Sequence, residues 1–217
     1  MPYRAIIFDL DGTLLDTIGD LADSINAVLS ENGLPNRPRN EFRYIIGDGM
    51  EMALRRLLPE SMHTPPTLKS FVDMVRDEYS VRWNSTSTPY PGIPGLLDYL
   101  KRKDIRTAVL SNKPHDFTVL MIESILDRWQ FDSVLGLSDR FPRKPDPASA
   151  LFTARALEVD PPDIIFLGDT SIDMKTARAA GMFAAGALWG YRERDELDAA
   201  GAHILVEHPV DLMRLFP

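Results

Sequence analysis

The sequence has no cysteine, and this absence removes several classes of chemistry. A chain of 217 residues without a thiol forms no disulfide, uses no thiolate nucleophile and holds no Cys-ligated zinc or iron–sulfur cluster. Its four histidines show no metal-binding spacing, and we interpret them as surface or structural residues: His63, His115, His203 and His208. A metal site in this chain is therefore expected to use oxygen ligands.

The sequence also lacks an excess of positive charge and a long apolar run. Lys and Arg total 24 against 32 Asp and Glu, a net charge of −8, so a nucleic-acid backbone is a poor partner. No stretch approaches the ~18 uninterrupted apolar residues of a membrane span. Residues 1–9 lack the charged head and cleavage site of a signal peptide. We expect a cytoplasmic protein with neither a membrane nor a nucleic acid as partner.

Short apolar runs, several of them followed by polar or acidic residues, recur along the chain and predict strands. They cover residues 3–8, 105–110, 131–137, 164–167, 183–189 and 203–206. Helical patterns separate the later runs, as in Leu96, Leu97 and Leu100. This alternation predicts an α/β fold with a doubly wound parallel sheet, in which ligands bind at the carboxyl ends of the strands.

The segment between the first two strands is too long for a simple crossover and must hold structure of its own. Two helical stripes lie in it: Ile18, Leu21, Ile25 and Val28, and then Leu68, Phe71, Val72, Val75 and Tyr79. Asn32-Gly33 is a typical helix stop, and residues 89–92 resemble a linker back into the sheet. We expect a core domain of residues 1–16 and 89–217, with an inserted helical cap of residues 17–88.

Acidic residues, a lysine and two hydrogen-bonding side chains follow the predicted strands or lie in the loops between them. They are Asp9, Asp11, Asp169, Asp173, Lys144, Ser111 and Asn112. Converging carboxylates repel one another unless a cation joins them, and oxygen-only ligands favour Mg²⁺. A lysine and hydrogen-bonding side chains suit the remaining phosphate oxygens. The set predicts phosphoryl transfer to a carboxylate nucleophile.

Four segments together resemble the sequence motifs of the haloacid dehalogenase superfamily, in the family's order. They are residues 8–17, 109–113, 144–147 and 168–173, with the sequences FDLDGTLLDT, VLSNK, KPDP and GDTSID. The resemblance covers nearly the whole chain. It implies a Rossmann-like α/β core with a helical cap.

The resemblance also implies a role for each catalytic residue. Asp9 would be the nucleophile that forms an aspartyl-phosphate, and Asp11 would protonate the leaving alcohol and then activate water. Lys144 would neutralise the nucleophile and the transferring group. Ser111 would bind the phosphate, with Asn112 nearby.

The metal ligands are likewise implied by the resemblance. Mg²⁺ would be held by Asp9, by the backbone carbonyl of Asp11 and by Asp169. Asp173 would act mainly through metal-bound water.

Within the superfamily, the sequence is most similar to the phosphoglycolate phosphatases, at residues 44–49, 112–114 and 189–192. Thr13, grouped with the substrate-binding residues, is typical of the phosphatases rather than of the sugar-phosphate mutases. In the cap, Arg43 is the nearest cation for a substrate carboxylate and Gly47 lies in the cap signature. Arg43 could instead be a solvated arginine on a helix, and Gly47 could simply belong to a turn between cap helices.

The core motifs have structural alternatives too. Asp9 and Asp11 could be an acidic turn after a strand, and Asp169 and Asp173 could serve only to cap a helix. Lys144 could be a solvated loop lysine. Ser111 and Asn112 could be no more than a turn.

The sequence thus predicts a Mg²⁺-dependent phosphatase of a small phosphate monoester, with phosphoglycolate favoured. Alternatives are hydrolysis of a sugar phosphate, a nucleotide or pyrophosphate, or transfer to an alcohol. A non-enzymatic alternative is a receiver-like domain phosphorylated on aspartate, but receivers have no helical insertion after their first strand. The expected partner is a small-molecule phosphate ester, and the expected assembly is a monomer or homodimer.

Overall fold

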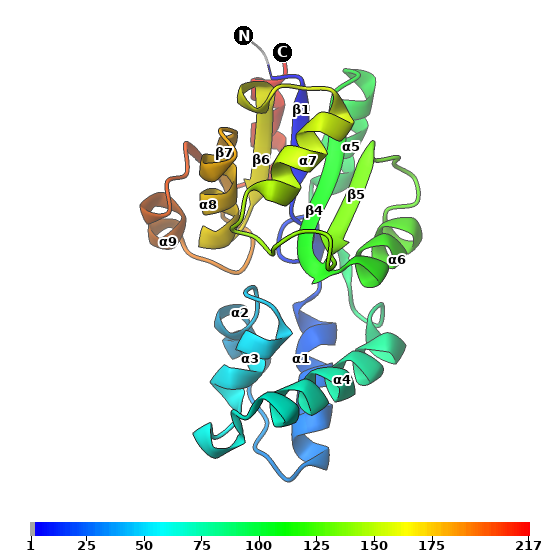
Figure 1. The fold of residues 1–217 in the computed structure, drawn as a ribbon. Helices are drawn as coiled ribbons and strands as arrows, with labels where there is room; N and C mark the ends of the chain where they lie inside the picture. The colour runs from blue at the N-terminus through cyan, green and yellow to red at the C-terminus, as the bar shows by residue number, and fades with distance from the viewer. Residues whose placement is uncertain (1–2) are drawn as a thin grey trace. The chain divides into compact units, whose positions relative to one another are not determined.

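The computed structural model describes residues 3–217, and this part of the chain forms two compact units (Figure 1). One unit holds the chain up to Leu15 together with Pro89–Pro217, and the other holds Asp16–Thr88. Residues 1 and 2, which begin the expected core segment 1–16, lie outside the described residues. Over residues 3–217, no helix is both long and apolar enough to span a membrane.

The larger unit is built, within the described residues, on a six-stranded sheet in the order β5-β4-β1-β6-β7-β8. The strands are β1 (Ala5–Phe8), β4 (Arg106–Pro114), β5 (Ser133–Leu137), β6 (Ile164–Gly168), β7 (Phe183–Ala187) and β8 (Ile204–Val206). All neighbours pair in parallel. The parallel α/β sheet expected from the alternating pattern is confirmed, and each expected strand is present.

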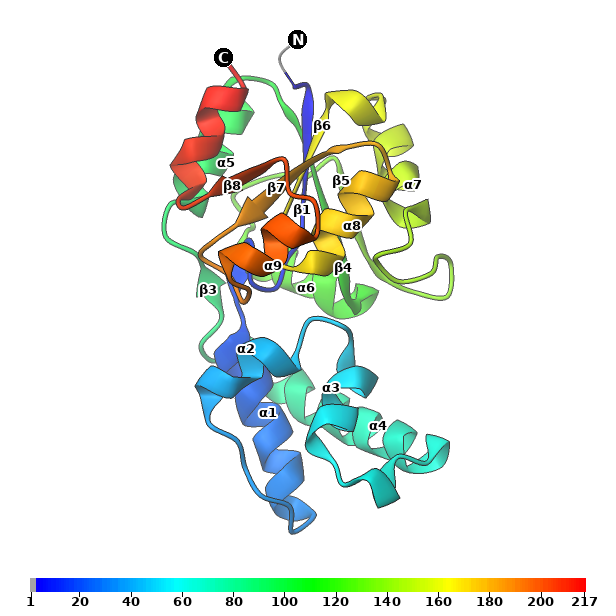
Figure 2. The same ribbon diagram turned by 90° about the vertical axis from the view of Figure 1, so that its left-hand side faces the viewer.

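Helices cover both faces of this sheet, which is why its strands read as apolar runs. Figure 2 shows α5 (Ile93–Arg102) and η4 (Pro209–Leu215) on one face, and α7 (Ala148–Leu157) and α8 (Ser171–Ala179) on the other. A buried apolar cluster joins β1, β4 and β6 to α7 and α8 through residues such as Ile7, Leu110, Phe166, Ala154 and Met174. α6 (His115–Ile125) packs along β4 and β5, α9 (Arg194–Ala199) packs on α8, and η3 (Pro161–Asp163) precedes β6.

β4 is longer than the sequence pattern suggests. The apolar run ends at Leu110, but the strand continues through Ser111, Asn112 and Lys113 to Pro114. Its pairing with β5 shifts register between Leu110 and Pro114. This irregularity places three polar residues on the extended backbone past the apolar run, and Ser111 and Lys113 among them are buried.

The smaller unit is helical and consists of α1 (Ile18–Glu31), η1 (Arg39–Glu41), α2 (Phe42–Ile45), α3 (Met50–Leu57), η2 (Glu60–Met62) and α4 (Pro65–Arg82). Both expected stripes are mostly buried, with Ile25 at 0% and Leu68 at 1% exposure, and α1 packs against α4. α1 ends at the expected stop, where Gly33 has φ +69°. The short helices α2 and α3 were not expected, because Gly47 (φ +120°) and Gly49 (φ +93°) interrupt the segment before a stripe can develop.

A buried carboxylate ties the beginning of the smaller unit to its end. Asp20, on the first turn of α1, is 1% exposed. Its oxygens accept from the backbone N–H groups of Thr86 (2.8 Å) and Ser87 (3.0 Å) and from both hydroxyls, each at 2.7 Å. Just outside these residues, β2 (Leu15–Asp16) pairs with β3 (Thr88–Pro89). The two points at which the chain passes from one unit to the other, residues 15–16 and 88–89, are therefore adjacent.

Candidate active site

Two adjacent strands of the larger unit end in aspartates. Asp9 follows β1 and Asp169 follows β6, and these strands are paired so that Phe8 lies opposite Leu167. The Asp9 N–H also donates to the Leu167 carbonyl at 2.9 Å. Parallel strands present their carboxyl ends at one edge of the sheet, so the pairing of β1 with β6 brings both acids together.

A third carboxylate completes this cluster. Oxygens of Asp9, Asp169 and Asp173 all lie within 4.8 Å of one another, and all three residues are buried. Asp9 Oδ1 lies 2.9 Å from the Lys144 ammonium but has no well-aligned hydrogen-bond donor. The possible metal ligands are all carboxylate oxygens, and one of these buried oxygens lacks a hydrogen-bond donor. Such a set fits a hard cation of the Mg²⁺ type.

Asp169 is held in a tight cradle. Thr13 Oγ1 donates to its Oδ1 at 3.1 Å, and the Tyr191 N–H donates to its Oδ2 at 2.7 Å. Two glycines make room for it. A Cβ at Gly12, where φ is +85°, would lie 2.2 Å from Asp169 Oδ2, and one at Gly190 would lie 2.3 Å from the Asp169 Cβ. Both residues must be glycine for the carboxylate to occupy this position.

Asp173 caps a helix and also belongs to the cluster. At the third position of α8, its Oδ2 accepts from the N–H (3.1 Å) and hydroxyl (2.6 Å) of Thr170, in a capping box. Its Oδ1 accepts from Lys144 Nζ at 2.6 Å. Capping is therefore only part of its role, because the second oxygen is turned to the lysine.

Lys144 joins the carboxylates from a loop. Its side chain is 3% exposed, and Nζ contacts Asp9 at 2.9 Å, Asp173 at 2.6 Å and the Leu110 carbonyl at 3.0 Å. Asn112 fixes the loop through both backbone groups of Lys144, accepting from its N–H at 2.8 Å and donating to its carbonyl at 3.1 Å. A solvated loop lysine is thereby excluded.

The cluster perturbs the pKa values of its members. Burial is the main cause that raises the pKa of Asp9 to about 7; the Lys144 ammonium opposes this shift and the Asp173 carboxylate adds to it. Burial, followed by the charges of Asp173 and Asp9, raises the pKa of Asp169 well above its ordinary value. For Lys144, burial lowers the pKa, but the carboxylates of Asp173 and Asp9 outweigh burial and raise it. Such perturbed groups are typical of functional sites.

These shifts give the metal-free protein a pH-dependent stability. Asp9 titrates near pH 7 when folded and near ~4 when unfolded, so the folded state binds more protons between these values. The free energy of unfolding in EDTA should therefore fall as pH rises from 4 to 7, by up to ~1.4 kcal/mol per pH unit. Urea unfolding measures this. The fall should be smaller in Asp9→Asn, and an equal fall in both proteins would contradict the assignment.

The Asp11 carboxylate is not part of the cluster of three and forms an ion pair with Lys113. Lys113 Nζ lies 3.1 Å from each carboxylate oxygen of Asp11. Lys113 was not among the predicted site residues. Its position directly after Ser111-Asn112 was a signal, but only the pairing across 102 residues reveals its partner.

The other predicted site residues fall into two groups. Ser111 is buried at 5% exposure and accepts from the Lys113 N–H at 3.2 Å. Thr13, predicted to bind substrate, is fully buried and its hydroxyl donates to Asp169, so its side chain positions that acid. Arg43 and Gly47 belong to the smaller unit, and their roles stay predictions.

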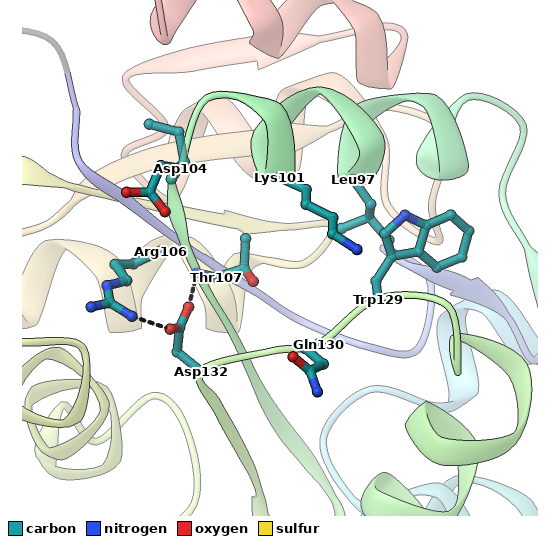
Figure 3. Close-up of a pocket in the computed structure, with 9 residues that line it drawn as sticks. Leu97, Lys101, Asp104, Arg106, Thr107, Trp129, Gln130 and Asp132 are labelled. Atoms are coloured by element: carbon teal, nitrogen blue, oxygen red, sulfur yellow. Dashed lines mark hydrogen bonds and ion pairs between the residues drawn. The ribbon is translucent and has the colours of Figure 1, made fainter.

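A separate pocket of about 200 Å³ opens beside the first residues of β4 (Figure 3). Lys101, Trp129 and Gln130 are among the residues that line it. Asp132 accepts from the Thr107 N–H at 2.8 Å and pairs with Arg106 at 2.6 Å. These polar groups serve the fold, and the pocket lies at the amino end of the strand, where such sheets do not bind their ligands.

Comparison with known proteins decides the family. The sequence profile of the haloacid dehalogenase-like hydrolases matches residues 6–187. The chain belongs to this family. The matched range contains the carboxylate cluster, Lys144 and Lys113, so the resemblance of the four motifs is confirmed. A receiver-like domain is accordingly without support, and this haloacid dehalogenase-like hydrolase is an enzyme.

Relatives of this hydrolase extend over its whole length. A phosphoglycolate phosphatase of Aquifex aeolicus is 32% identical, over 98% of this chain and 96% of its own. An N-acetylmuramic acid 6-phosphate phosphatase of Pseudomonas aeruginosa is 31% identical, over 98% and 94%. The crystal structure of a candidate phosphoglycolate phosphatase from Lactobacillus delbrueckii subsp. bulgaricus has a TM-score of 0.93 at 27% identity, over 100% of this chain and 99% of that one.

Proposed function

We propose that this hydrolase is a Mg²⁺-dependent phosphatase that cleaves a small phosphate monoester through an aspartyl-phosphate on Asp9. One observation carries the proposal: Lys144 bridges Asp9 and Asp173 at 2.9 and 2.6 Å, within a cluster whose three carboxylates share one point. This arrangement places an ammonium and three carboxylate ligands where a phosphoryl group would be attacked.

In the first step, an Asp9 carboxylate oxygen forms a bond to phosphorus while the bond from phosphorus to the ester oxygen breaks. Asp11, which enters this step protonated, gives its proton to the departing alkoxide, which leaves as an alcohol. In the second step, Asp11 takes a proton from water, the water oxygen bonds to phosphorus, and Asp9 is released as a carboxylate. Phosphate is the second product.

The surrounding residues hold this chemistry in place. Lys144 offsets the charge of Asp9 and of the transferring group, and the Ser111 hydroxyl donates to a phosphate oxygen. Asn112 acts by fixing the Lys144 loop. Asp9, the Asp11 carbonyl, Asp169 and Asp173 would hold Mg²⁺, which when bound supplies positive charge to the phosphoryl group.

Phosphoglycolate is the favoured substrate, because both the sequence resemblance and the name of the Aquifex relative point to it. A second candidate is a sugar phosphate, favoured by the N-acetylmuramic acid 6-phosphate phosphatase at 31% identity. We assign residues 17–88 the role of a cap that selects between such substrates, with Arg43 and Gly47 as its proposed substrate contacts.

Phosphate release from a substrate panel tests the proposal. We expect hydrolysis with Mg²⁺ and loss of at least ~100-fold in EDTA, restored by Mg²⁺. Phosphoglycolate should have the highest kcat/KM among N-acetylmuramic acid 6-phosphate, other sugar phosphates, a nucleotide and pyrophosphate. Full activity in EDTA would contradict the metal, and a sugar phosphate ranking first would select the second candidate.

A further inference from the structure

The second lysine of the site, Lys113, is buried beside Asp11. Lys113 lies on β4 within the register shift, between Leu110 and Pro114, and its side chain is 4% exposed. Its ammonium lies 3.1 Å from both Oδ1 and Oδ2 of Asp11, whose side chain is 20% exposed. Equal distances to the two oxygens mean that the ammonium spans the carboxylate and restricts its rotation.

Stability alone is a poor reason for this arrangement. Removing an ammonium from water costs several kcal/mol, and a buried ion pair often does no more than repay that cost. The carboxylate that Lys113 contacts is not one of the three in the cluster, whose own lysine is Lys144, in contact with Asp9 and Asp173. The site therefore has one buried lysine beside the nucleophile and another beside the proton-transfer residue.

We propose that Lys113 is a positioning residue of the reaction, which fixes the Asp11 carboxylate so that one oxygen faces the leaving group and later the water. This assignment rests on the proposed function. Asp11 serves both chemical steps from one place, and an aspartate on the Gly12 turn has two free torsions of its own. Misplacing a catalytic group by about 1 Å lowers rates by up to ~100-fold.

A positioning role makes a prediction about leaving groups. An alkyl alkoxide must be protonated as it departs, whereas the p-nitrophenolate ion is stable without a proton. The contribution of Asp11 to the first step is therefore large for an alkyl phosphate and small for p-nitrophenyl phosphate. A residue that acts through Asp11 must show the same difference.

The test compares kcat and KM of Lys113→Met for phosphoglycolate and for p-nitrophenyl phosphate, together with single-turnover rate constants that report the first step. We expect kcat to fall about 10–100-fold for phosphoglycolate and less than about 3-fold for the aryl ester, with KM nearly unchanged. In an Asp11→Asn background, Lys113→Met should cause no further loss. Lys101→Met, at an exposed lysine of α5, is the matched control and should match the wild type.

Each other outcome has a meaning. Equal losses on the two esters, or an undiminished loss in the Asp11→Asn background, would overturn the positioning role. A rise in KM alone would make Lys113 a substrate ligand instead. If Lys113→Met fails to fold, Lys113→Gln, whose shorter side chain lacks the ammonium that spans the Asp11 carboxylate, carries the same comparison. A wild type inactive on both esters overturns the proposed function and this role with it, whereas the other outcomes leave the proposed function standing.

Discussion

Replacing Asp9 by Asn should remove phosphate release while leaving the protein folded. The amide is a poor nucleophile and no longer offers a carboxylate to phosphorus, so kcat should fall on the order of 10⁴-fold. The Asn side chain has the same shape as that of Asp, and it removes the buried Asp9 carboxylate, whose pKa is raised to about 7. The metal-free variant should therefore be at least as stable as the wild type at pH 8.

Three measurements check this expectation: phosphate release, urea unfolding and acid-quench labelling with a radioactive phosphate ester. The wild type should retain label on the protein during turnover, and Asp9→Asn should retain none. Asp160→Asn is the matched control, because Asp160 is exposed just before η3 and its loss should change neither activity nor labelling. Labelling of the Asp9→Asn protein would show that a residue other than Asp9 is the nucleophile.

Replacing Lys144 by Met should damage both activity and stability. The side chain is 3% exposed and its ammonium lies between Asp9 and Asp173, so methionine leaves buried carboxylates without a partner. Breaking a buried pair from one side costs about 3–5 kcal/mol of unfolding free energy. The first step loses the charge that offsets the nucleophile, and kcat should fall at least ~1000-fold.

Mg²⁺ should partly rescue the stability of Lys144→Met but not its activity. A divalent cation placed among the carboxylates supplies part of the missing charge, so added Mg²⁺ should raise the melting temperature of the variant more than that of the wild type. Lys175→Met, at an exposed lysine of α8, should respond as the wild type does. An equal Mg²⁺ shift in Lys144→Met and wild type would mean that the cation does not bind at this cluster.

The sheet and its acids were predictable because their signals are local. A buried run followed by Asp-Leu-Asp-Gly or Gly-Asp is visible in a few consecutive residues, and parallel pairing then places Asp9 beside Asp169. The partners of Lys113 and Thr13 were not predictable in this way. Each contact joins residues 102 or 156 positions apart, and it depends on which strands become neighbours.

The extent of β4 and the short helices α2 and α3 were missed for a related reason. Ser111, Asn112 and Lys113 are polar, so the sequence signals a turn, whereas pairing with β5 keeps the backbone extended as far as Pro114. The 4-residue α2 is too short to develop the apolar stripe from which a helix is inferred.

The bonds from Asp20 to Thr86 and Ser87 also bear on evolution. They join residues near the two ends of the inserted unit, so that residues 16–88 leave and re-enter the larger unit at two adjacent points. A module attached in this way can be lengthened, replaced or shortened without redirecting any strand of the sheet. New substrate preferences can thus arise by exchanging the insert while the catalytic residues at the carboxyl ends of β1 and β6 are inherited unchanged.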